Sequence, residues 1–432
     1  MEKYTVKQLH NPKDIVVTVP GSKSITNRAL LLAALSQGKC TISGVLFSDD
    51  SRAFLSCLES LGFSLSVDEA KKEVTIQGTG GVIPNKKAQI NVRSAGTAAR
   101  FLTVMLAFAG GEYTLQSSEQ MEKRPMQPLL SELRAAGVEI TCLKNEGCFP
   151  FILRSNGVDI KEITIDTEIS SQFASALLMS ATLCKKGLTV KLTGNRTEGA
   201  YIAITAKMLS QFGIRYEKAG AEYYILPQQS YSLTSYDIEP DFSAACYFFA
   251  AGALLNKKAT VKGLRLSSMQ GDKKFLSVLQ NMGCTVLESQ EGVTLTGVET
   301  LRGVSVNMND FSDQALTLAA IAPFASSPTQ ITGVAHIRKQ ECDRIHAMAV
   351  NLKAMGVKVE EKEDGITVYP CNQILPAQIQ TFSDHRVAMS FSIAGLKCGC
   401  LTIQNPKCCQ KTFENFFEVL EGLYLYSKEE DV

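Results

Sequence analysis

The stretch Val19-Pro20-Gly21-Ser22-Lys23-Ser24-Ile25-Thr26-Asn27-Arg28 runs directly into the apolar segment Ala29-Leu30-Leu31-Leu32-Ala33-Ala34-Leu35. The β-branched residues before it, 14–19, predict a strand that Pro20 and Gly21 end, and serines and a threonine then predict a capped helix start. A helix N-terminus attracts anions, and Lys23 and Arg28 add two cations there. The stretch therefore predicts an anion site. An ordinary capped helix with two solvated cations is the alternative, and the spacing is not that of a Walker A loop.

The size and charge of the chain limit its class. With 432 residues it is too long for one core, so two domains are expected. Lys and Arg number 44 against 43 Asp and Glu, a net charge of +1, so no overall field would recruit nucleic acid or an anionic membrane. No apolar run reaches the roughly 20 residues of a membrane span, and the N-terminus lacks an apolar segment. We expect a cytoplasmic protein with no nucleic-acid or membrane partner.

The chain has 13 cysteines and 4 histidines. The cysteines lie mostly inside apolar segments, as Cys57, Cys184 and Cys246 do, which is typical of reduced, buried thiols. No histidine stands at ligand spacing from Cys398-Gly399-Cys400 or Cys408-Cys409, so we expect no metal site.

Two kinds of helix recur along the chain. An amphipathic helix that ends at a glycine and is followed by a strand recurs with glycines at 62, 137, 213, 283 and 356, and more weakly at 422. A second, almost wholly apolar helix begins near residues 27, 99, 172, 244, 314 and 386. A helix that is apolar all round is buried all round. The pattern predicts an α/β (α+β) chain of six units, split into two domains of three, with buried parallel helices and outer sheets.

Small, polar and charged residues precede every buried helix. They are Ser22-Lys23-Ser24, Arg93-Ser94-Ala95-Gly96-Thr97, Ser170-Ser171-Gln172, Asp241-Phe242-Ser243, Asp310-Phe311-Ser312-Asp313 and Ser383-Asp384-His385-Arg386. If the three buried helices of a domain run parallel, these ends gather on one face, and two such faces would form a cleft. Six unrelated capped termini are the alternative.

Eight motifs then occur together in order: residues 20–28, Ala95-Gly96-Thr97-Ala98-Ala99-Arg100, Lys123-Arg124-Pro125-Met126, Ser170-Ser171-Gln172, Asp310-Phe311-Ser312-Asp313, Gln340-Glu341-Cys342-Asp343-Arg344-Ile345, residues 383–389 and Lys411-Thr412-Phe413. Each alone is weak, but together they resemble the 5-enolpyruvylshikimate-3-phosphate synthase family over nearly the whole chain. The resemblance implies two domains of three βαβαββ units, the enolpyruvyl transferase fold or inside-out α/β barrel.

The resemblance also implies an activity. Family members transfer the enolpyruvyl (carboxyvinyl) group of phosphoenolpyruvate to the 5-hydroxyl of shikimate 3-phosphate and release phosphate, on the route to chorismate and the aromatic amino acids. They use no metal or organic cofactor, so we expect none. The expected partners are the two substrates, and the chain is expected to act as a monomer.

Matching motifs imply site residues. Lys23, Ser24 and Arg28 are expected to face shikimate 3-phosphate, whose phosphate and ring Ser170, Ser171 and Gln172 would hold. The expected phosphoenolpyruvate pocket consists of Gly96, Arg124, Arg344, Arg386 and Lys411. Arginine suits this purpose because its planar fork pairs bidentately with carboxylate or phosphate.

The reaction needs a base for the 5-hydroxyl and an acid for the methylene carbon. Asp313, Glu341, Lys23 and His385 are the candidates; we expect Asp313 to be the base and Glu341 with Lys23 to form the proton-donor side. Asp343 and Asp384 are expected to orient arginines.

Several positions depart from the common family pattern. Gln340 stands where a lysine is usual, Glu198 where a serine is usual, and His336 where an asparagine is usual. Phe101 replaces a common proline beside the pocket that the herbicide glyphosate occupies in this family. Gly96 is retained, which favours sensitivity to that inhibitor without deciding it.

Two rival functions remain open. A UDP-sugar enolpyruvyl transferase usually has Lys-Asn in place of Lys23-Ser24 and a loop cysteine, whereas residues 117–126 contain none. A non-catalytic phosphometabolite-binding protein on the same scaffold would explain Gln340 and Glu198. In either case, residues 1–20 plus 238–432 are expected to form one domain and 21–237 an inserted one. We expect shikimate 3-phosphate to close the two.

Overall fold

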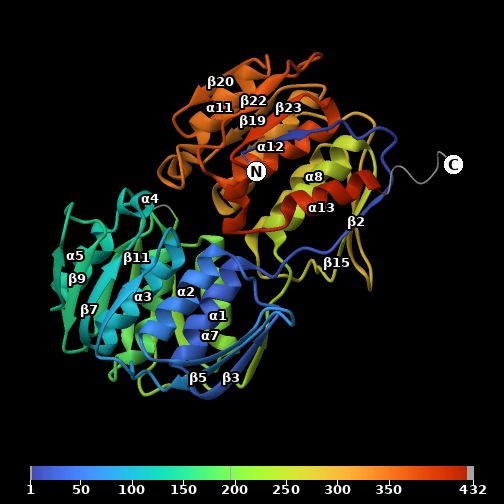
Figure 1. Ribbon diagram of the computed structural model, residues 1–432. Coiled ribbons are helices and arrows are strands. Elements are labelled where there is room, and N and C mark those ends of the chain that lie inside the picture. The colour runs from blue at the N-terminus through green and yellow to red at the C-terminus, as the bar shows by residue number, and fades with distance from the viewer. Residues whose placement is uncertain (1, 195, 426–432) are drawn as a thin grey trace. The chain divides into compact units, whose positions relative to one another are not determined.

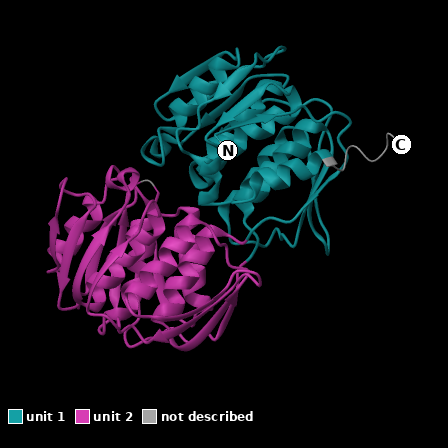
Figure 2. Cartoon of the chain, viewed as in Figure 1, with its two compact units in different colours: residues 1–20, 239–432 teal, residues 21–238 magenta. Residues whose placement is uncertain are grey.

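The computed structural model describes residues 2–194 and 196–425. The chain divides into two compact units, which Figure 2 shows in different colours. Unit 1 consists of Met1–Pro20 and Glu239–Val432, and unit 2 of Gly21–Ile238. Unit 1 is therefore built from both ends of the chain, and unit 2 is inserted into it.

Unit 2 alternates strands and helices. Its helices are α1 (Lys23–Leu35), α2 (Asp49–Ser60), α3 (Gly96–Ala109), α4 (Glu119–Glu122), α5 (Gln127–Ala135), α6 (Ser171–Ser180), η1 (Ala181–Leu183) and α7 (Ala200–Gln211). Its strands are β3 (Gln37–Ser43), β4 (Ser64–Asp68), β5 (Glu73–Thr79), β6 (Lys87–Asn91), β7 (Gly111–Gln116), β8 (Glu139–Cys142), β9 (Phe151–Ser155), β10 (Glu162–Asp166), β11 (Leu188–Thr193), β12 (Tyr216–Ala219), β13 (Glu222–Ile225) and β14 (Ser235–Asp237).

Unit 1 repeats the same order of elements. Its helices are α8 (Phe242–Leu255), η2 (Gly271–Lys273), α9 (Lys274–Asn281), η3 (Asn309–Gln314), α10 (Ala315–Ile321), η4 (Ala322–Phe324), η5 (Ala335–Lys339), α11 (Arg344–Ala354), α12 (His385–Cys398), η6 (Pro406–Lys411) and α13 (Phe416–Leu425). Its strands are β1 (Lys3–Val6), β2 (Ile15–Val17), β15 (Lys258–Lys262), β16 (Thr285–Glu288), β17 (Gly292–Thr296), β18 (Ser305–Asn307), β19 (Thr329–Thr332), β20 (Val359–Lys362), β21 (Gly365–Val368), β22 (Ala377–Ile379) and β23 (Leu401–Gln404).

The sheets confirm the six-fold repeat. Their strand orders are β14-β3-β5-β4, β6-β7-β9-β8 and β10-β11-β13-β12 in unit 2, and β2-β15-β17-β16, β18-β19-β21-β20 and β22-β23-β1 in unit 1. In every sheet the first two strands run parallel and the others antiparallel. Among the described residues, five of these sheets have the four strands of a βαβαββ repeat, and the sixth, β22-β23-β1, has three.

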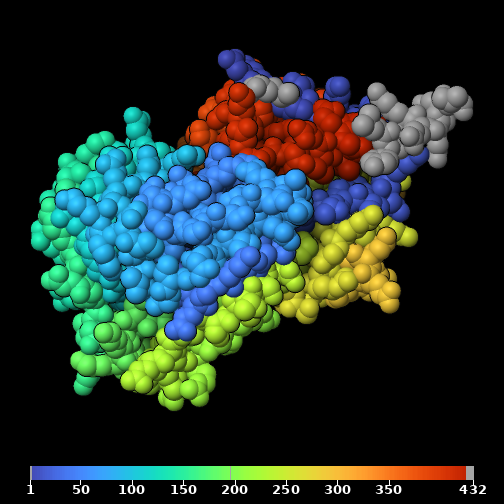
Figure 3. Space-filling view, turned by 60° about the horizontal axis from the view of Figure 1, so that its bottom comes forward, coloured from blue at the N-terminus to red at the C-terminus, as the bar shows by residue number. Residues whose placement is uncertain are grey.

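The chain passes from unit 1 into unit 2 after Pro20 and returns after Ile238, and the strands next to these two crossings complete two of the sheets. β2, which precedes the passage into unit 2, pairs in parallel with β15, Val16 opposite Thr260. β14, which ends unit 2, pairs in parallel with β3, Tyr236 opposite Ile42. Figure 3 shows the N-terminal segment, in deep blue, beside the yellow and orange chain of unit 1. Each unit is therefore closed by a strand adjacent to a crossing.

The helices predicted to be wholly buried are α1, α3, α6, α8, α10 and α12, and they lie inside their units with the sheets outside (Figure 1). In α8, only Ser243 of the 14 residues is not buried. Burial of a large apolar side chain contributes roughly 1.5–3 kcal/mol, so these helices carry much of the driving force for folding. The expected α/β architecture is confirmed.

The glycines predicted to end the amphipathic helices do so in five cases out of six. Gly62, Gly137, Gly213, Gly283 and Gly356 follow α2, α5, α7, α9 and α11 with φ between 79° and 116°. A side chain at such a φ would be strained. The sixth, weaker copy is wrong: Gly422 lies within α13, without a positive φ, because the last helix continues through it.

Hydrogen bonds bring the N-terminal ends of the buried helices together within each unit. In unit 2, Asn27 of α1 donates to Thr97 Oγ1 of α3 at 2.6 Å, and Arg28 of α1 donates to Ser175 Oγ of α6 at 3.0 Å. In unit 1, Arg386 of α12 donates to Tyr247 of α8 at 3.5 Å. These contacts join residues in the first halves of the helices, which is the arrangement expected of buried helices that run parallel.

Candidate active site

The start of α1 is the first part of the site in unit 2. Ser22 holds the N-cap position, but its side chain makes no capping hydrogen bond. Thr26, the third residue expected to cap, accepts a hydrogen bond from the Leu46 N–H at 3.3 Å instead. Lys23, the first residue of α1, reaches the buried Asp50 of α2 at 3.4 Å. The prediction of side-chain capping by Ser22 is therefore wrong, and Lys23 is held by a carboxylate that the sequence interpretation did not include.

Arg28 is buried, and neutral groups use most of its donors. Its Nε donates to Thr205 Oγ1 at 2.7 Å and its Nη2 to Ser175 Oγ at 3.0 Å and to the Tyr201 carbonyl at 3.1 Å. Nη1 donates to the Ser24 carbonyl at 2.8 Å. Burial lowers the pKa of Arg28 to about 10. Three of these four hydrogen bonds fix the start of α1 against α6 and α7, and the fourth stays within α1, so they use four of the five N–H groups.

Gly96, the first residue of α3, lies against two guanidinium groups. A Cβ atom at this position would come within 2.7 Å of Arg124 Nη1 and 2.9 Å of Arg100 Nη1. Arg100 Nη1 also donates to the Gly96 carbonyl at 3.2 Å, and its guanidinium lies 5.8 Å from the Phe173 ring centroid. A side chain here would therefore push these guanidinium groups aside, and glycine lets two cations lie at the start of a helix.

The start of α6 supplies neutral polar groups. Ser170 is its N-cap, and the Oγ atom accepts from the Gln172 N–H at 3.3 Å. Ser171 is buried, and Gln172 has a buried side-chain oxygen without a hydrogen-bond partner among the described residues. All eight site residues predicted in unit 2 therefore lie at the starts of α1, α3 and α6 or beside them.

The site in unit 1 centres on Asp313, at the end of η3 just before α10. Asp313 Oδ1 accepts from Arg344 Nη1 at 2.9 Å, and Oδ2 accepts from Arg386 Nη2 at 2.7 Å. Its side chain is 14% exposed. The carboxylate is thus held by two arginines while still reachable from solvent.

Arg344, the first residue of α11, is the hub of this network. Its Nε donates to Asp384 Oδ2 at 2.8 Å, its Nη2 to Glu341 Oε2 at 3.0 Å, and its Nη1 makes a close hydrogen bond to Gln340 Oε1. Burial lowers the pKa of Arg344, but Asp384, Glu341 and Asp313 together raise it above its ordinary value. Gln340, where a lysine was expected, therefore serves as an uncharged acceptor for Arg344.

Glu341 links Arg344 to Lys411. Its Oε1 accepts from Lys411 Nζ at 3.0 Å, and both side chains are 10% exposed. Three carboxylates, those of Asp313, Glu341 and Asp384, thus face three cations, those of Arg344, Arg386 and Lys411. We call these six residues the unit 1 ion network; its charges balance within itself.

The two aspartates expected to orient arginines behave differently. Asp384 is fully buried, holds Arg344 and caps α12 through the Arg386 N–H at 2.8 Å. Asp343 caps α11 but pairs with Arg338 at 2.8 Å, outside the ion network. His385 is buried, with Nδ1 3.7 Å from Asp384 Oδ1. Only Asp384 therefore fulfils the expected role toward the site arginines.

Residues missed from the sequence lie where the amphipathic helices begin. Asp50 of α2 pairs with Lys23, and Asp272 of η2, just before α9, accepts a short hydrogen bond from Ser243 of α8. Arg124 and Arg344 occupy the corresponding places before or at α5 and α11. A search for charged residues at these six helix starts, and not only at the buried ones, would have found them.

The remaining departures from the family pattern have local explanations. Glu198 forms an exposed pair with Lys218 at 3.1 Å. His336 Nε2 lies 2.7 Å from Ser312 Oγ, so the histidine ties η5 to η3, which carries Asp313. Lys339 is exposed at the end of η5.

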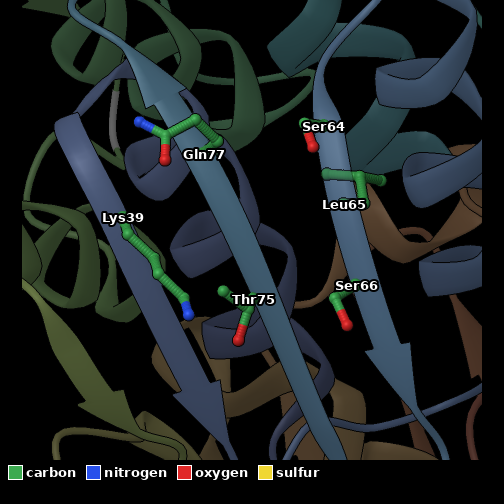
Figure 4. Close-up of a pocket in the computed structure, with 6 residues that line it drawn as sticks. All are labelled: Lys39, Ser64, Leu65, Ser66, Thr75 and Gln77. Atoms are coloured by element: carbon green, nitrogen blue, oxygen red, sulfur yellow. The ribbon is translucent and has the colours of Figure 1, made fainter.

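A shallow groove of about 230 Å³ lies elsewhere, on the outer face of the sheet formed by β3, β5 and β4. Figure 4 shows its lining residues, Lys39, Ser64, Leu65, Ser66, Thr75 and Gln77. It holds one charged side chain and none of the predicted site residues.

In the described part of the chain, no helix is long and apolar enough to cross a membrane, and no group of three or more His, Cys, Asp or Glu side chains could hold a metal ion.

Comparison with known proteins agrees with this arrangement. The model of the family EPSP synthase (3-phosphoshikimate 1-carboxyvinyltransferase) matches residues 10–420. The 3-phosphoshikimate 1-carboxyvinyltransferase of Trichormus variabilis is 41% identical over 418 residues, covering 96% of this chain and 98% of that one. The protein of the same name from Sulfurovum is 39% identical over 413 residues, covering 95% and 96%.

Solved structures share the fold over the same length. EPSP synthase from Acinetobacter baumannii superposes with a TM-score of 0.82 at 25% identity and covers 98% of both chains. The enolpyruvyl transferase NikO from Streptomyces tendae gives 0.77 at 18% identity, covering 98% of this chain and 97% of that one, and so shows the fold alone. On the family match and these relatives, the chain belongs to the EPSP synthase (3-phosphoshikimate 1-carboxyvinyltransferase) family.

Proposed function

We propose that this chain transfers the carboxyvinyl group of phosphoenolpyruvate to the 5-hydroxyl of shikimate 3-phosphate and releases phosphate. Family membership over residues 10–420 supports the reaction. The observation that carries the residue roles is Asp313, a carboxylate held by two arginines and reachable from solvent. A carboxylate fixed in this way has the geometry to accept a proton from a hydroxyl beside it.

The proton-donor side is Glu341 with Lys411, and Lys23 in unit 2. In the ion network, Lys411 and Arg344 favour the ionised form of Glu341. When a phosphate or carboxylate group of the substrate takes over these cations, that stabilisation is lost, and Glu341 takes up a proton that it can deliver to the methylene carbon. As the methylene carbon takes this proton, the 5-oxygen, deprotonated by Asp313, bonds to C2 of phosphoenolpyruvate and gives a tetrahedral intermediate. That intermediate returns a methyl proton to Glu341 while the bond between C2 and the phosphate oxygen breaks, so phosphate leaves and the enolpyruvyl double bond re-forms.

The binding roles follow the charge of each site. Arg124, beside Gly96, and Arg344, Arg386 and Lys411 provide cations for the phosphate and carboxylate of phosphoenolpyruvate. Lys23, Ser24, Arg28, Ser170, Ser171 and Gln172 provide the polar groups for shikimate 3-phosphate. Because one transfer needs groups from both units, shikimate 3-phosphate should draw the units together. A radius of gyration that does not fall on adding it would contradict this.

The test is phosphate release from phosphoenolpyruvate with and without shikimate 3-phosphate. We expect release that depends on shikimate 3-phosphate in the wild type and falls by about 10²–10⁴ in Asp313→Asn. Asp310→Asn is the matched control, since Asp310 lies on the same η3 but pairs with Lys274 at the surface. Binding of shikimate 3-phosphate without any release would support the non-catalytic reading, and release that needs a UDP-sugar would support the other rival.

The cysteines bear on where the protein acts. All thirteen cysteines are free thiols. Five of them are partly buried and pack against the hydrophobic core of unit 1. Reduced thiols in such numbers are typical of a reducing compartment, which supports a cytoplasmic location. We further propose a monomer that needs no cofactor, which sedimentation and a metal-free assay would test.

A further inference from the structure

Asp272 is a buried carboxylate that the proposed mechanism does not use. It lies in η2, between β15 and α9, with 6% of its surface exposed. Its Oδ2 accepts a short hydrogen bond from Ser243 Oγ at the start of α8, and its backbone carbonyl accepts from Cys246 Sγ at 3.6 Å. Two contacts thus fix the residue to the N-terminal end of a central helix of unit 1.

The loop that carries Asp272 is itself held in place. Gln270 Oε1 accepts from the Phe242 N–H at 3.0 Å, and Gln270 Nε2 donates to Glu239 at 3.0 Å and to the Pro240 carbonyl at 2.8 Å. Glu239 also accepts from Ser268 at 2.6 Å. So many polar contacts over residues 268–272 define a specific position for the carboxylate of Asp272.

That position faces the ion network. η2 packs against η3, which contains Asp313 and ends at Gln314. Burial and the charge of Asp313 raise the pKa of Asp272 to about 6, while Arg386 lowers it. Asp272 and Asp313 are thus two carboxylates that share the field of Arg386, one by direct contact and the other through space.

The repeat gives an independent argument. In other units, the charged residue at the start of the amphipathic helix contacts the start of the buried helix before it: Asp50 contacts Lys23, Arg124 borders Gly96, and Arg344 contacts Asp313. Asp272, which contacts Ser243, occupies this place in the first of the three repeats of unit 1. The repeat thus presents Asp272 at a place where other units carry residues of the candidate site.

We propose that Asp272, held by Ser243, is a positioning residue for the reaction, whose negative charge makes Asp313 a stronger base. This inference rests on the proposed function. Asp272 does not touch the reacting atoms. Its charge repels that of Asp313 and competes for Arg386, so Asp313 binds a proton more strongly once Asp272 is ionised.

The other charged groups around Asp272 do not compensate for it. Asp241, the N-cap of α8, adds a further negative charge. Lys273 donates to the Leu266 and Ser268 carbonyls, and Lys274 pairs with Asp310 at 2.6 Å, so both are engaged elsewhere. Arg386 lowers the pKa of Asp272, whereas the charges of Asp313 and Asp241 raise it. Ionisation of Asp272 therefore changes the charge that Asp313 experiences.

The experiment is the rate of phosphate release between pH 5 and 9, at saturating substrates, for the full chain and Asp272→Asn. We expect the wild-type rate to rise as pH passes about 6. Asp272→Asn keeps the shape and the hydrogen bond to Ser243 but should lack this rise, leaving it about tenfold slower at pH 8. Its KM for phosphoenolpyruvate should stay within about twofold, because the arginines remain.

Ser243→Ala is the second variant. Without the hydroxyl donor, Asp272 holds its proton to higher pH, so the rise should move upward while the rate at pH 9 is kept. Asp310→Asn, on η3 but exposed, should leave the profile unchanged. A profile of Asp272→Asn that has the wild-type shape would overturn the role of Asp272 alone. A wild type without release at any pH would overturn this inference and the proposed function together.

Discussion

The two clusters of candidate site residues, one in each unit, hold a buried arginine in opposite ways. In unit 2, buried Arg28 donates only to hydroxyls and carbonyls. The neutral residues Ser170, Ser171 and Gln172 lie at the start of α6, which Arg28 also contacts through Ser175. In unit 1, buried Arg344 faces Asp313, Glu341 and Asp384. One arginine is positioned by dipoles and the other by full charges.

This difference separates binding from proton transfer. Donors held by neutral acceptors keep their positive charge available, which suits recognition of an anion whose charge does not change. Cations held by carboxylates must exchange partners when an anionic ligand arrives, and this exchange alters which carboxylates hold protons. We therefore expect unit 2 to contribute mainly affinity and unit 1 mainly chemistry.

The largest contrast should come from removing each arginine. Arg344→Met leaves three carboxylates without their common partner, so we expect a loss of about 3–5 kcal/mol in the free energy of unfolding. Arg28→Met leaves only neutral groups, and Thr205 already donates to Ser175 at 2.8 Å, so the loss should be about 1–3 kcal/mol. Urea unfolding followed by circular dichroism measures both. Equal losses would break the comparison.

The second prediction concerns stability and pH. Since the pKa of Asp272 is raised from 3.8 to about 6, its proton is bound more tightly in the folded chain than in the unfolded one. The contribution of this bound proton to the free energy of unfolding is fully present below about pH 4 and is lost as pH rises to about 6, a change of about 3 kcal/mol. Asp272→Asn should remove this dependence and be more stable than the wild type above pH 6.

The measurement is the urea midpoint of unfolding of the wild type and of Asp272→Asn at pH 4.5 and at pH 7.5. The difference between the chains should be larger at the higher pH. Asp310→Asn, whose carboxylate is exposed, serves as control. A constant difference between wild type and Asp272→Asn would mean that Asp272 is ionised throughout this range.

The third prediction addresses space in unit 2. Gly96→Ala places a methyl group against Arg124 and Arg100, so both guanidinium groups must move by several tenths of an ångström or more. We expect the KM for phosphoenolpyruvate to rise by about tenfold to a hundredfold, with a smaller change in kcat. Gly422→Ala is the matched control, because a Cβ there meets nothing within 4 Å. An unchanged KM would exclude Arg124 from the phosphoenolpyruvate pocket.

The fold could be predicted largely because the chain repeats itself. Helix-ending glycines and apolar helices at regular spacing indicated six units, and the sheets confirm them. The prediction failed at Gly422, where α13 continues to Leu425; in the last repeat, the strand that pairs with β23 in antiparallel is β1, from the N-terminus.

The site was only partly predictable, because sequence shows which residues carry charge but not which charges face each other. The use of Gln340 as an acceptor for Arg344 depends on the turn between η5 and α11. Asp50 and Asp272 look like ordinary helix-start carboxylates. Only the packing of each amphipathic helix against its buried neighbour brings them to Lys23 and Ser243.

The smallest effect is predicted for Glu198, whose presence in place of the usual serine raised the possibility of a non-catalytic protein. Its side chain is 74% exposed and pairs with Lys218, also exposed, at 3.1 Å. Exposed pairs contribute little because solvent screens them and both side chains lose freedom. Glu198→Ala should therefore change the free energy of unfolding by no more than about 0.5 kcal/mol and leave kcat within about twofold of the wild type. A tenfold loss in kcat/KM for shikimate 3-phosphate would instead assign Glu198 to the binding site and give the turn before α7 a part in recognition.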